Sequence, residues 1–338
     1  MIALNNLNDL GDMRGKEILY LLIPFLLFIA CDRIEGDPSG DELARFNAWI
    51  DVNNIEAIAD TVTPDGLYYI NQHEGTGLAP TDSSYLIYSC TVRNLDDHLY
   101  VTTDSLTADL YGIYSHSTHY VPVFSLYLSN SFYPVGLREG LKMMKEGGKA
   151  RLIMSSNLAY GKSGSGPIPS YESLIYDVEL IKVVTDPLAY EQTQITEFLN
   201  NNPGFTLYHD SIYIRRDVEG IRDCIVADDS MALVYYTGRY LDNIIFDTNI
   251  KSVAIENGIY SSSKSYSQLT FSVGSSSVVS GFNLAVKQMI EKEKITVLIP
   301  STYAYGKNGS KGGSTVIYPY TPLIFEITLD RLDPKPKY

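Results

Sequence analysis

Two stretches of the sequence decide the fold: LREGLKMMKEGGKARLIMSSNLAYG at residues 137–161 and FNLAVKQMIEKEKITVLIPSTYAYG at residues 282–306. Each stretch opens with apolar residues spaced i, i+4 and i+7, which predicts a helix with one apolar face. These residues are Leu137, Leu141 and Met144 in the first stretch and Phe282, Val286 and Met289 in the second. A β-rich run follows in both stretches, and both end in Ala-Tyr-Gly. The same unit therefore occurs twice, 145 residues apart.

The repeat extends upstream of these stretches. The further matched pairs are residues 88–103 with 234–249 and residues 66–70 with 211–215. Each copy also begins with a helical pattern, which is Leu43, Phe46 and Ile50 in the first copy and Ile195, Phe198 and Leu199 in the second. A repeat of this length predicts two tandem globular domains rather than a solenoid, with a boundary near residues 185–187.

Short β-rich runs dominate each unit, and only one internal helix is evident in each. The expected strands are residues 85–93, 151–155 and 174–183 in the first unit and residues 231–240, 295–299 and 323–332 in the second. An antiparallel sheet with one apolar face needs a cover, and the internal helix is the only candidate. The pattern therefore predicts an α+β fold of two tandem domains.

The second unit resembles the FKBP-type peptidyl-prolyl isomerases. The motifs that carry the resemblance stand in the family's order: Val234-Tyr-Tyr-Thr-Gly238, Phe246-Asp247, Phe271-Ser-Val-Gly274, Val278-Val-Ser-Gly281-Phe282, Ile299-Pro-Ser-Thr-Tyr-Ala-Tyr-Gly306 and Pro322-Leu-Ile-Phe325. The resemblance implies a bent antiparallel sheet wrapped around a short helix, residues 281–291, with the active site between them. It also implies peptidyl-prolyl cis–trans isomerase (rotamase) activity.

By the same resemblance, the second unit holds the site residues. The expected catalytic residues are Asp247, Tyr305 and Tyr236. The expected substrate-binding residues are Phe246, Phe271, Val278, Val279, Phe282, Ile317 and Phe325. Asp247 is expected to accept a hydrogen bond at the rim, and the Val279 backbone N–H to hold a substrate carbonyl. Leu269 is an alternative to Phe271 in one wall, and Phe282 stands where the family commonly has a tryptophan.

These residue types fit the chemistry of proline isomerisation. Amide resonance opposes rotation about a peptide bond by about 18–20 kcal/mol, and X–Pro bonds isomerise in roughly tens to hundreds of seconds. The resonance form is charge-separated, so an apolar pocket destabilises the planar state relative to the twisted one. This needs neither a nucleophile nor a proton transfer, and we expect no cofactor and no metal. Taken singly, Phe246 and Phe325 are more typical of a plain core than of a pocket.

The first unit lacks the groups that this chemistry uses. Cys90 stands in place of Tyr236, Val101 in place of Asp247, Pro134 in place of Val279 and Leu137 in place of Phe282. Proline has no N–H to offer a substrate. An alignment shifted by two residues would put Tyr88 in place of Tyr236, but the acceptor and the donor would still be lost. We therefore expect an FKBP-like domain without catalysis at residues 41–184, a linker at 185–189 and the isomerase domain at 190–338.

Four further features are weaker signals. The loop at residues 307–319 carries Tyr318-Pro319 where the family usually has a proline pair, which leaves the efficiency of catalysis open. Gly161-Lys-Ser163 lacks the earlier glycine of a phosphate-binding loop, so we interpret it as a flap. His116 and His119 have no third metal ligand nearby and predict a solvated loop. Cys90 and Cys224 lie in different domains and are expected to be free thiols.

The N-terminal segment carries a targeting signal. Residues 18–30 form an apolar run that is too short for a bilayer core, and Arg14 and Lys16 precede it. The run ends in Phe28-Ile-Ala-Cys31, which resembles the lipobox of bacterial lipoproteins with Cys31 as the lipidation site; an ordinary signal peptide is the alternative. Asp9 and Asp12 are unusual in such a segment and favour a start at Met13. We expect a signal peptide at residues 1–31 and a polar tether at 32–40.

Composition limits the classes of function. The 338 residues are 45% hydrophobic and 20% charged, which excludes a mainly disordered protein. The net charge of -14 argues against nucleic acid as a partner. We expect an isomerase that assists folding of proline-containing polypeptides in the bacterial cell envelope, lipid-anchored in the periplasm or at the outer-membrane surface. The main alternative is a non-catalytic lipoprotein that binds unfolded chains or a surface partner, and a glycan-binding protein is the third.

Overall fold

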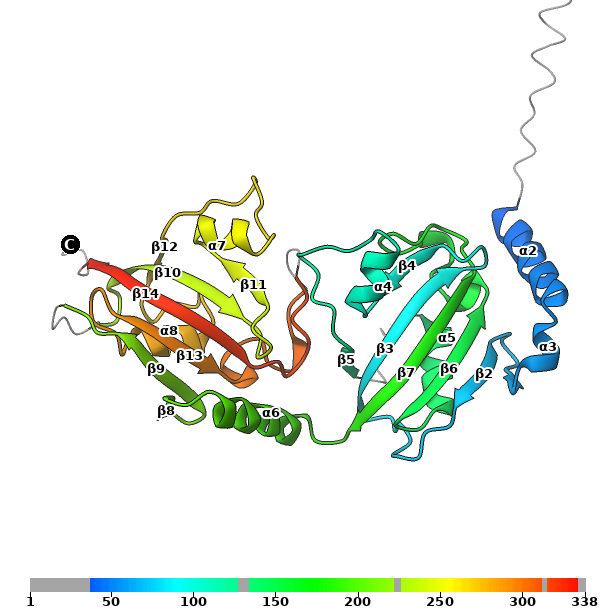
Figure 1. Ribbon diagram of the computed structural model, residues 1–338, viewed down its shortest axis with the longest axis horizontal. Coiled ribbons are helices and arrows are strands. Elements are labelled where there is room, and N and C mark those ends of the chain that lie inside the picture. Colours follow the sequence, from blue (N-terminus) through cyan, green and yellow to red (C-terminus); the bar gives the residue numbers. More distant parts are fainter. Residues whose placement is uncertain (1–36, 127–133, 222–225, 312–314, 334–338) are drawn as a thin grey trace, which may run out of the picture.

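The structure is a computed structural model that describes residues 37–126, 134–221, 226–311 and 315–333, and it contains two antiparallel sheets (Figure 1). The strand order of the first sheet is β1 (Thr61–Val62), β2 (Tyr68–His73), β6 (Gly148–Met154), β7 (Leu174–Val184), β3 (Tyr85–Asn94) and β4 (Leu99–Thr102), and β5 (Val123–Leu126) also pairs with β3. The strand order of the second sheet is β8 (Thr206–His209), β9 (Ile212–Val218), β13 (Lys294–Ile299), β14 (Leu323–Asp333), β10 (Met231–Arg239) and β11 (Ile245–Thr248), and β12 (Leu269–Ser272) also pairs with β10. The two sheets have one topology, and the predicted α+β class is confirmed.

The long strands lie where the apolar alternation predicts them. Along β3, buried residues alternate with partly exposed ones, and β7 and β14 show the same alternation over most of their length. Since side chains of a strand point to opposite faces, this pattern marks one face of each sheet as core. All six predicted strands appear with ends shifted by only a few residues. The short edge strands β4, β5, β11 and β12 were not predicted.

The helices are more numerous than the sequence predicted. The described helices are α2 (Pro38–Val52), α3 (Ile55–Ile58), α4 (Ser105–Leu110), α5 (Val135–Met143), α6 (Pro187–Asn201), α7 (Lys251–Glu256) and α8 (Ser280–Val286). The prediction of a single internal helix per unit was wrong, because α4 and α7 are single short turns without a long apolar period. The predicted helix 281–291 ends early at Val286. The chain turns there, and the Ile290 amide bonds to the Glu293 carboxylate at 2.9 Å.

The internal helices α5 and α8 each cover the apolar face of their sheet. The predicted residues of α5 and the turn after it, Leu137, Leu141 and Met144, are 3%, 0% and 3% exposed. Their counterparts Phe282, Val286 and Met289 are 3%, 0% and 1% exposed. Burying each such side chain stabilises the fold by about 1.5–3 kcal/mol. The prediction that these residues face the core of each unit is therefore confirmed.

Helices α2 and α6 begin at equivalent Asp-Pro pairs. The Asp37 carboxylate accepts from the Ser39 amide at 3.1 Å, and the Asp186 carboxylate accepts from the Ala189 amide at 3.0 Å. Proline is favoured in the first turn because its fixed φ suits a helix and no N–H is needed there. Residues 38–40 of the predicted tether and residues 187–189 of the predicted linker are therefore helical.

A buried glutamate fastens each of these helices to its sheet. Glu42 accepts hydrogen bonds from the Ser156 amide at 3.0 Å and from its hydroxyl at 2.9 Å. Glu191 accepts the same pair from Ser301, at 2.5 and 2.6 Å. Both glutamates are at most 4% exposed, and buried carboxylates need such partners. Ser301 begins the turn that carries Tyr303 and leads to Tyr305, so α6 supports the predicted site.

The predicted signal peptide and Cys31 lie outside the described residues. Within the described part of the chain, none of the helices combines the length and apolar character that crossing a bilayer requires.

Candidate functional site

Four aromatic rings of the second sheet form one continuous cluster with Phe282 of α8. The ring centroids of Phe282 lie 5.3 Å from Phe325, 5.9 Å from Phe271 and 6.0 Å from Tyr236, and Phe246 lies 5.6 Å from Phe325. Phe282 and Phe246 both stand at 89° to Phe325, which is the edge-to-face geometry that aromatic pairs favour. These five rings are scattered over ninety residues of sequence, and the fold brings them together. They form one rigid surface, which we call the aromatic wall.

Asp247 lies beside this wall and is bonded from two sides. The Tyr236 hydroxyl donates to its Oδ2 at 2.6 Å, and the Lys264 ammonium contacts its Oδ1. Tyr236 comes from β10, Asp247 from the neighbouring β11, and Lys264 from the loop between α7 and β12. The Asp247 and Lys264 side chains are 38% and 35% exposed, so their ion pair contributes only about 0–1 kcal/mol to stability.

Two phenols near Asp247 stay protonated at neutral pH. Burial raises the pKa of Tyr236 far above its ordinary value, and the negative charge of Asp247 raises it further. Burial also raises the pKa of Tyr305, and again the charge of Asp247 adds to the effect. Each phenol is therefore a hydrogen-bond donor next to a carboxylate, since the charged form is disfavoured by burial and by a neighbouring like charge.

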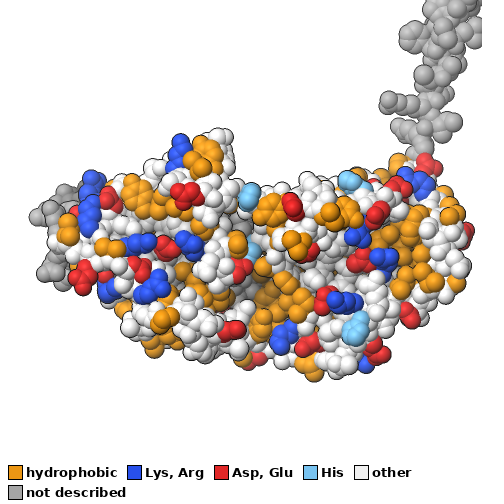
Figure 2. All heavy atoms as spheres, in the orientation of Figure 1, with side chains coloured by type: hydrophobic (Ala, Val, Ile, Leu, Met, Phe, Trp, Pro, Cys, Tyr) orange, Lys and Arg blue, Asp and Glu red, His pale blue; other side chains and the backbone are white. Residues whose placement is uncertain are grey.

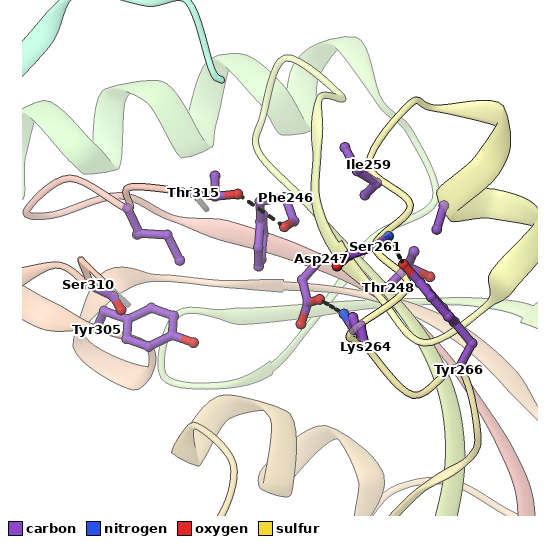
Figure 3. A pocket seen from close by; sticks show the side chains of 12 residues that line it. Phe246, Asp247, Thr248, Ile259, Ser261, Lys264, Tyr266, Tyr305, Ser310 and Thr315 are labelled. Atoms are coloured by element: carbon purple, nitrogen blue, oxygen red, sulfur yellow. Dashed lines mark hydrogen bonds and ion pairs between the residues drawn. The ribbon is translucent and has the colours of Figure 1, made fainter. Parts of the chain in front are cut away.

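A pocket of about 330 Å³ opens beside Asp247 (Figure 3). Tyr305 is 38% exposed, and its ring points across the pocket toward Asp247. The predicted site residues that line the pocket are Phe246, Asp247, Tyr305 and Ile317. A half-open space with an aromatic wall and a few polar groups is typical of a small ligand site.

The other predicted site residues lie in the wall rather than on the pocket surface. Phe271, Phe282 and Phe325 are 3%, 3% and 6% exposed. The half-buried members of the same cluster are Tyr236, Leu269, Val278 and Val279. Phe282 is almost fully covered and packs against the rings of Tyr236 and Phe325. The structure instead places the accessible space over Phe246 and Asp247.

One wall of the pocket was missed by the sequence analysis. Its residues are Thr248, Ala254, Ile259, Ser261, Lys264 and Tyr266, from β11, α7 and the following loop. The signal was present in the repeat, because Tyr-Ser-X-Ser-X-X-Tyr occurs at residues 114–120 and again at 260–266. The pattern alone did not show that Lys264 turns back onto Asp247.

The first sheet has the same positions but different groups. Val101 faces Val92 across β3 and β4, as Asp247 faces Gly238 across β10 and β11. The Cys90 amide donates to a side-chain oxygen thirteen residues on, that of Thr103, at 3.0 Å. The Tyr236 amide donates to Asn249 in the same way at 2.8 Å. This register puts Cys90, and not Tyr88, in the place of Tyr236.

The corresponding pocket residues of the first sheet are neutral. Burial raises the pKa of Cys90 to about 12, so the thiol stays protonated. The hydroxyls of Tyr160 and Tyr176 lie 3.2 Å apart, and burial raises the pKa of both. Val101 supplies no acceptor where the second sheet has Asp247. The first sheet thus keeps the strand register of the second without its carboxylate.

Comparison with known proteins identifies the family of this chain. The model of the FKBP-type peptidyl-prolyl cis-trans isomerase family matches residues 114–181 and 225–330, which is half of the chain and includes parts of both sheets. The chain belongs to this family. The family predicted from the motifs of the second unit is confirmed.

Individual relatives share parts of the chain. Peptidyl-prolyl cis-trans isomerase FKBP9 of Homo sapiens is 27% identical over 327 residues, covering 95% of this chain and 46% of that protein. FKBP-type peptidyl-prolyl cis-trans isomerase FkpA of Escherichia coli (strain K12) is 33% identical over 128 residues, covering 37% of this chain and 40% of that protein. The matches thus span less than half the length of these relatives. The crystal structure of FkpA from Escherichia coli aligns at 26% identity with a TM-score of 0.36, covering 51% of this chain and 74% of that chain.

Proposed function

We propose that this protein catalyses the cis–trans isomerisation of X–Pro bonds in polypeptides and that the second copy alone holds the activity. The observation that carries the proposal is the Tyr236–Asp247 hydrogen bond of 2.6 Å at the edge of a pocket that Phe246, Tyr305 and Ile317 also line. The first copy has Cys90 and Val101 at the positions of the two bonded residues.

The geometry suits stabilisation of a twisted amide. Contact of a prolyl ring with Phe246 and Ile317 would remove water from the amide and weaken its charge-separated resonance form. As the bond twists, the nitrogen becomes pyramidal and the carbonyl oxygen can turn toward a fixed donor. The Tyr305 hydroxyl, which points across the pocket, is placed to donate to that oxygen. Asp247 holds the Tyr236 phenol and so fixes the rim against which the substrate rests.

The test uses the full chain and a reporter protein whose refolding is limited by prolyl isomerisation. Wild-type protein should accelerate the slow phase, and the double variant Asp247→Val and Tyr305→Ala should lose at least about 90% of the acceleration. Tyr160→Ala, the substitution equivalent to Tyr305→Ala in the first copy, is the matched control and should leave the rate unchanged. A wild-type protein without any effect on the slow phase would refute the proposal, and full loss of activity in Tyr160→Ala would refute its assignment to the second copy.

One observation favours the alternative of a non-catalytic binding protein. The Lys264 ammonium already contacts Asp247, and the rings of Phe282 and Phe325 are covered. A binding protein would suppress aggregation of an unfolded chain, and the Asp247→Val and Tyr305→Ala variant would retain this effect. The refolding assay separates the two functions, because a binding protein slows or leaves unchanged the proline-limited phase.

We further propose that the protein acts in the bacterial cell envelope, held to the membrane through a lipid on Cys31. The support is the apolar run at residues 18–30 followed directly by Cys31. A lipid on a tethered domain anchors it without a membrane-spanning segment. Expression in a bacterium with a labelled fatty acid tests this: the full chain should take up label and Cys31→Ser should not. Equal labelling of both would contradict the proposal.

A further inference from the structure

The two copies contain the same loop, which follows α4 in the first copy and α7 in the second. The outer tyrosines of the loop stack with centroids 5.3 Å apart in both copies, Tyr114 on Tyr120 and Tyr260 on Tyr266. In both, the amide of the serine after the first tyrosine donates to the hydroxyl of the second at 2.9 Å. The scaffold of the loop is thus independent of what its tip contacts.

The tips of the two loops have different contacts. In the second copy, Lys264 turns back onto Asp247 of its own sheet. The first copy has Thr118 and Val101 at these positions, so it has neither partner of that ion pair. Instead, its next residue, His119, reaches the second sheet. The second copy has Ser265 at the position of His119 and so has no imidazole for an equivalent contact.

His119 makes two contacts at the turn between β10 and β11. Its ring stacks on Tyr240 with centroids 4.0 Å apart and planes at 13°, and its Nε2 lies 2.7 Å from Asp242 Oδ2. The His119 side chain is only 13% exposed. The interpretation as a solvated loop was therefore wrong for His119, which packs against the other copy, whereas His116 is exposed. Burial alone would raise the pKa of Asp242, but His119 and backbone amides lower it below its ordinary value.

Tyr240 connects this contact to the pocket of the second copy. It is 4% exposed, its ring lies 5.2 Å from that of Phe246, and its hydroxyl donates to the Val316 carbonyl at 3.0 Å. Phe246 and Ile317, the neighbour of Val316, are two walls of the pocket. His119 therefore touches a side chain that contacts both the aromatic wall and the segment carrying Ile317.

The first sheet also contacts the other end of that segment. Tyr85 lies 5.2 Å from Tyr320 with ring planes at 88°. A groove of about 400 Å³ separates the two sheets here, and hydrophobic side chains gather around the hollow in the centre of Figure 2. Tyr318 lines this groove together with Ile87 and Phe124 of the first sheet. Burial raises the pKa of Tyr318 to about 12, with a further contribution from the nearby Cys90 thiol.

We propose that the first copy acts as a brace that holds segment 315–322 of the second copy in the shape its pocket requires, with His119 on Tyr240 as the main contact. His119 is then a positioning residue for a reaction that takes place in the other copy. The effect of the brace on catalysis rests on the proposed function. The contact between the two copies and its effect on segment 315–322 can be measured without any substrate.

A pair of equivalent glycines gives a matched test of the brace. Gly258 and Gly112 share φ +69, so alanine strains the backbone equally at both. An added Cβ at Gly258 would lie 2.5 Å from the His116 ring of the first copy, whereas nothing lies within 4 Å of one at Gly112. Gly258→Ala should therefore push the two copies apart, and Gly112→Ala is its control. His119→Ala removes both contacts, and His119→Phe keeps only the stacking.

Two measurements on the full chain read out these variants. Hydrogen exchange of the amides of Ile317 and Tyr320 should become about 10-fold faster in His119→Ala and Gly258→Ala, and stay near wild type in Gly112→Ala. If the pocket-competent shape falls to about a fifth of the population, KM for a proline peptide rises about 5-fold while kcat stays within about 2-fold. His119→Phe should lie between His119→Ala and wild type in both measurements.

The outcomes distinguish the brace from the catalytic proposal. Unchanged exchange at Ile317 and Tyr320 in both His119→Ala and Gly258→Ala would overturn the brace, whatever the activity of the protein. Faster exchange in a protein that isomerises nothing would uphold the brace and overturn the proposed function. Equal effects of Gly258→Ala and Gly112→Ala would also overturn the brace, because backbone strain would then explain both.

Discussion

The hydrogen bond from Tyr236 to Asp247 is the contact whose loss should best separate an active copy from an inactive one. Tyr236→Phe removes the hydroxyl and keeps the ring on Phe282 and Phe325, which lie 6.0 and 6.3 Å away. Asp247→Val introduces the residue that the first copy has at position 101. The two single variants and the double variant make a cycle that isolates the contribution of the bond.

The size of the effect follows from the geometry. A hydrogen bond to a charged group contributes about 1.5–3 kcal/mol, and the partial exposure of Asp247 favours the lower end. Each single variant should therefore lose about 1.5 kcal/mol of stability, which lowers the Tm by about 3–6 °C for a domain of this size. If the pair fixes the rim of the pocket, kcat/KM falls about 10-fold in each variant. Asp247→Val also removes the weak ion pair with Lys264, so the double variant should lose little more than Asp247→Val alone, because the Tyr236–Asp247 bond is already absent in that variant.

Thermal unfolding and the proline-limited refolding assay measure the two quantities on the same samples. Tyr235→Phe is the control, since Tyr235 is the neighbouring tyrosine on the other face of β10 and is 36% exposed. It should change stability by less than about 0.5 kcal/mol. Losses that simply add in the double variant would show that Tyr236 and Asp247 act independently. An unchanged rate in Asp247→Val would refute the role of this carboxylate in the site.

Three further outcomes are expected. Glu191→Ala leaves the Ser301 amide and hydroxyl without their acceptor and should lower the free energy of unfolding in urea by about 2–3 kcal/mol. Wild-type stability of this variant would refute the role of the Glu191–Ser301 hydrogen bonds. Burial raises the pKa of Tyr176 and Tyr236 above the unfolded value of 10.0. The contribution of these protonated phenols to stability is therefore complete below pH 10.0 and is lost as the pH rises through their folded pKa values. Equal urea midpoints at about pH 9 and about pH 11 would contradict this expectation. Lys264→Met frees Asp247 and should raise kcat/KM about 3-fold in the peptide assay with little change in Tm, whereas a loss of activity would show that the ion pair supports the site.

The sequence predicts the sheets well because their signal is local and occurs twice. The alternation of apolar residues along β3 and β10 depends only on neighbours in sequence, and the matching copy removes ambiguity in the register. The hydrogen bonds that Glu42 and Glu191 accept from serines could not be predicted in this way. Their partners, Ser156 and Ser301, lie 114 and 110 residues away along the chain. A glutamate on a helix is typical of a solvated face, and only the fold shows that these two are buried.

The candidate site was predicted in part for a similar reason. The identities of Tyr236, Asp247 and Tyr305 follow from motifs in the correct order, and the structure brings them to one pocket edge. Which rings are accessible depends on how α8 packs against the sheet, and this covers Phe282. The position of Lys264 depends on a loop whose length is not constrained by strand pairing. The order of the motifs thus predicts which residues belong to the candidate site, while packing decides which of them are accessible.

The two copies show how a repeat can change side chains at equivalent positions and keep its fold. The stacked tyrosines and the serine–tyrosine bond hold the loop at residues 114–120 without any help from the position that Val101 occupies. The residues at the tip of that loop can therefore differ from those at the tip of the equivalent loop in the second copy. In the second copy, Lys264 points inward to the Asp247 carboxylate. In the first copy, His119 points outward to Tyr240 and Asp242. The same rigid scaffold serves a pocket in one copy and an interface in the other, because the fold constrains the stem of the loop and leaves the chemistry of its tip unconstrained.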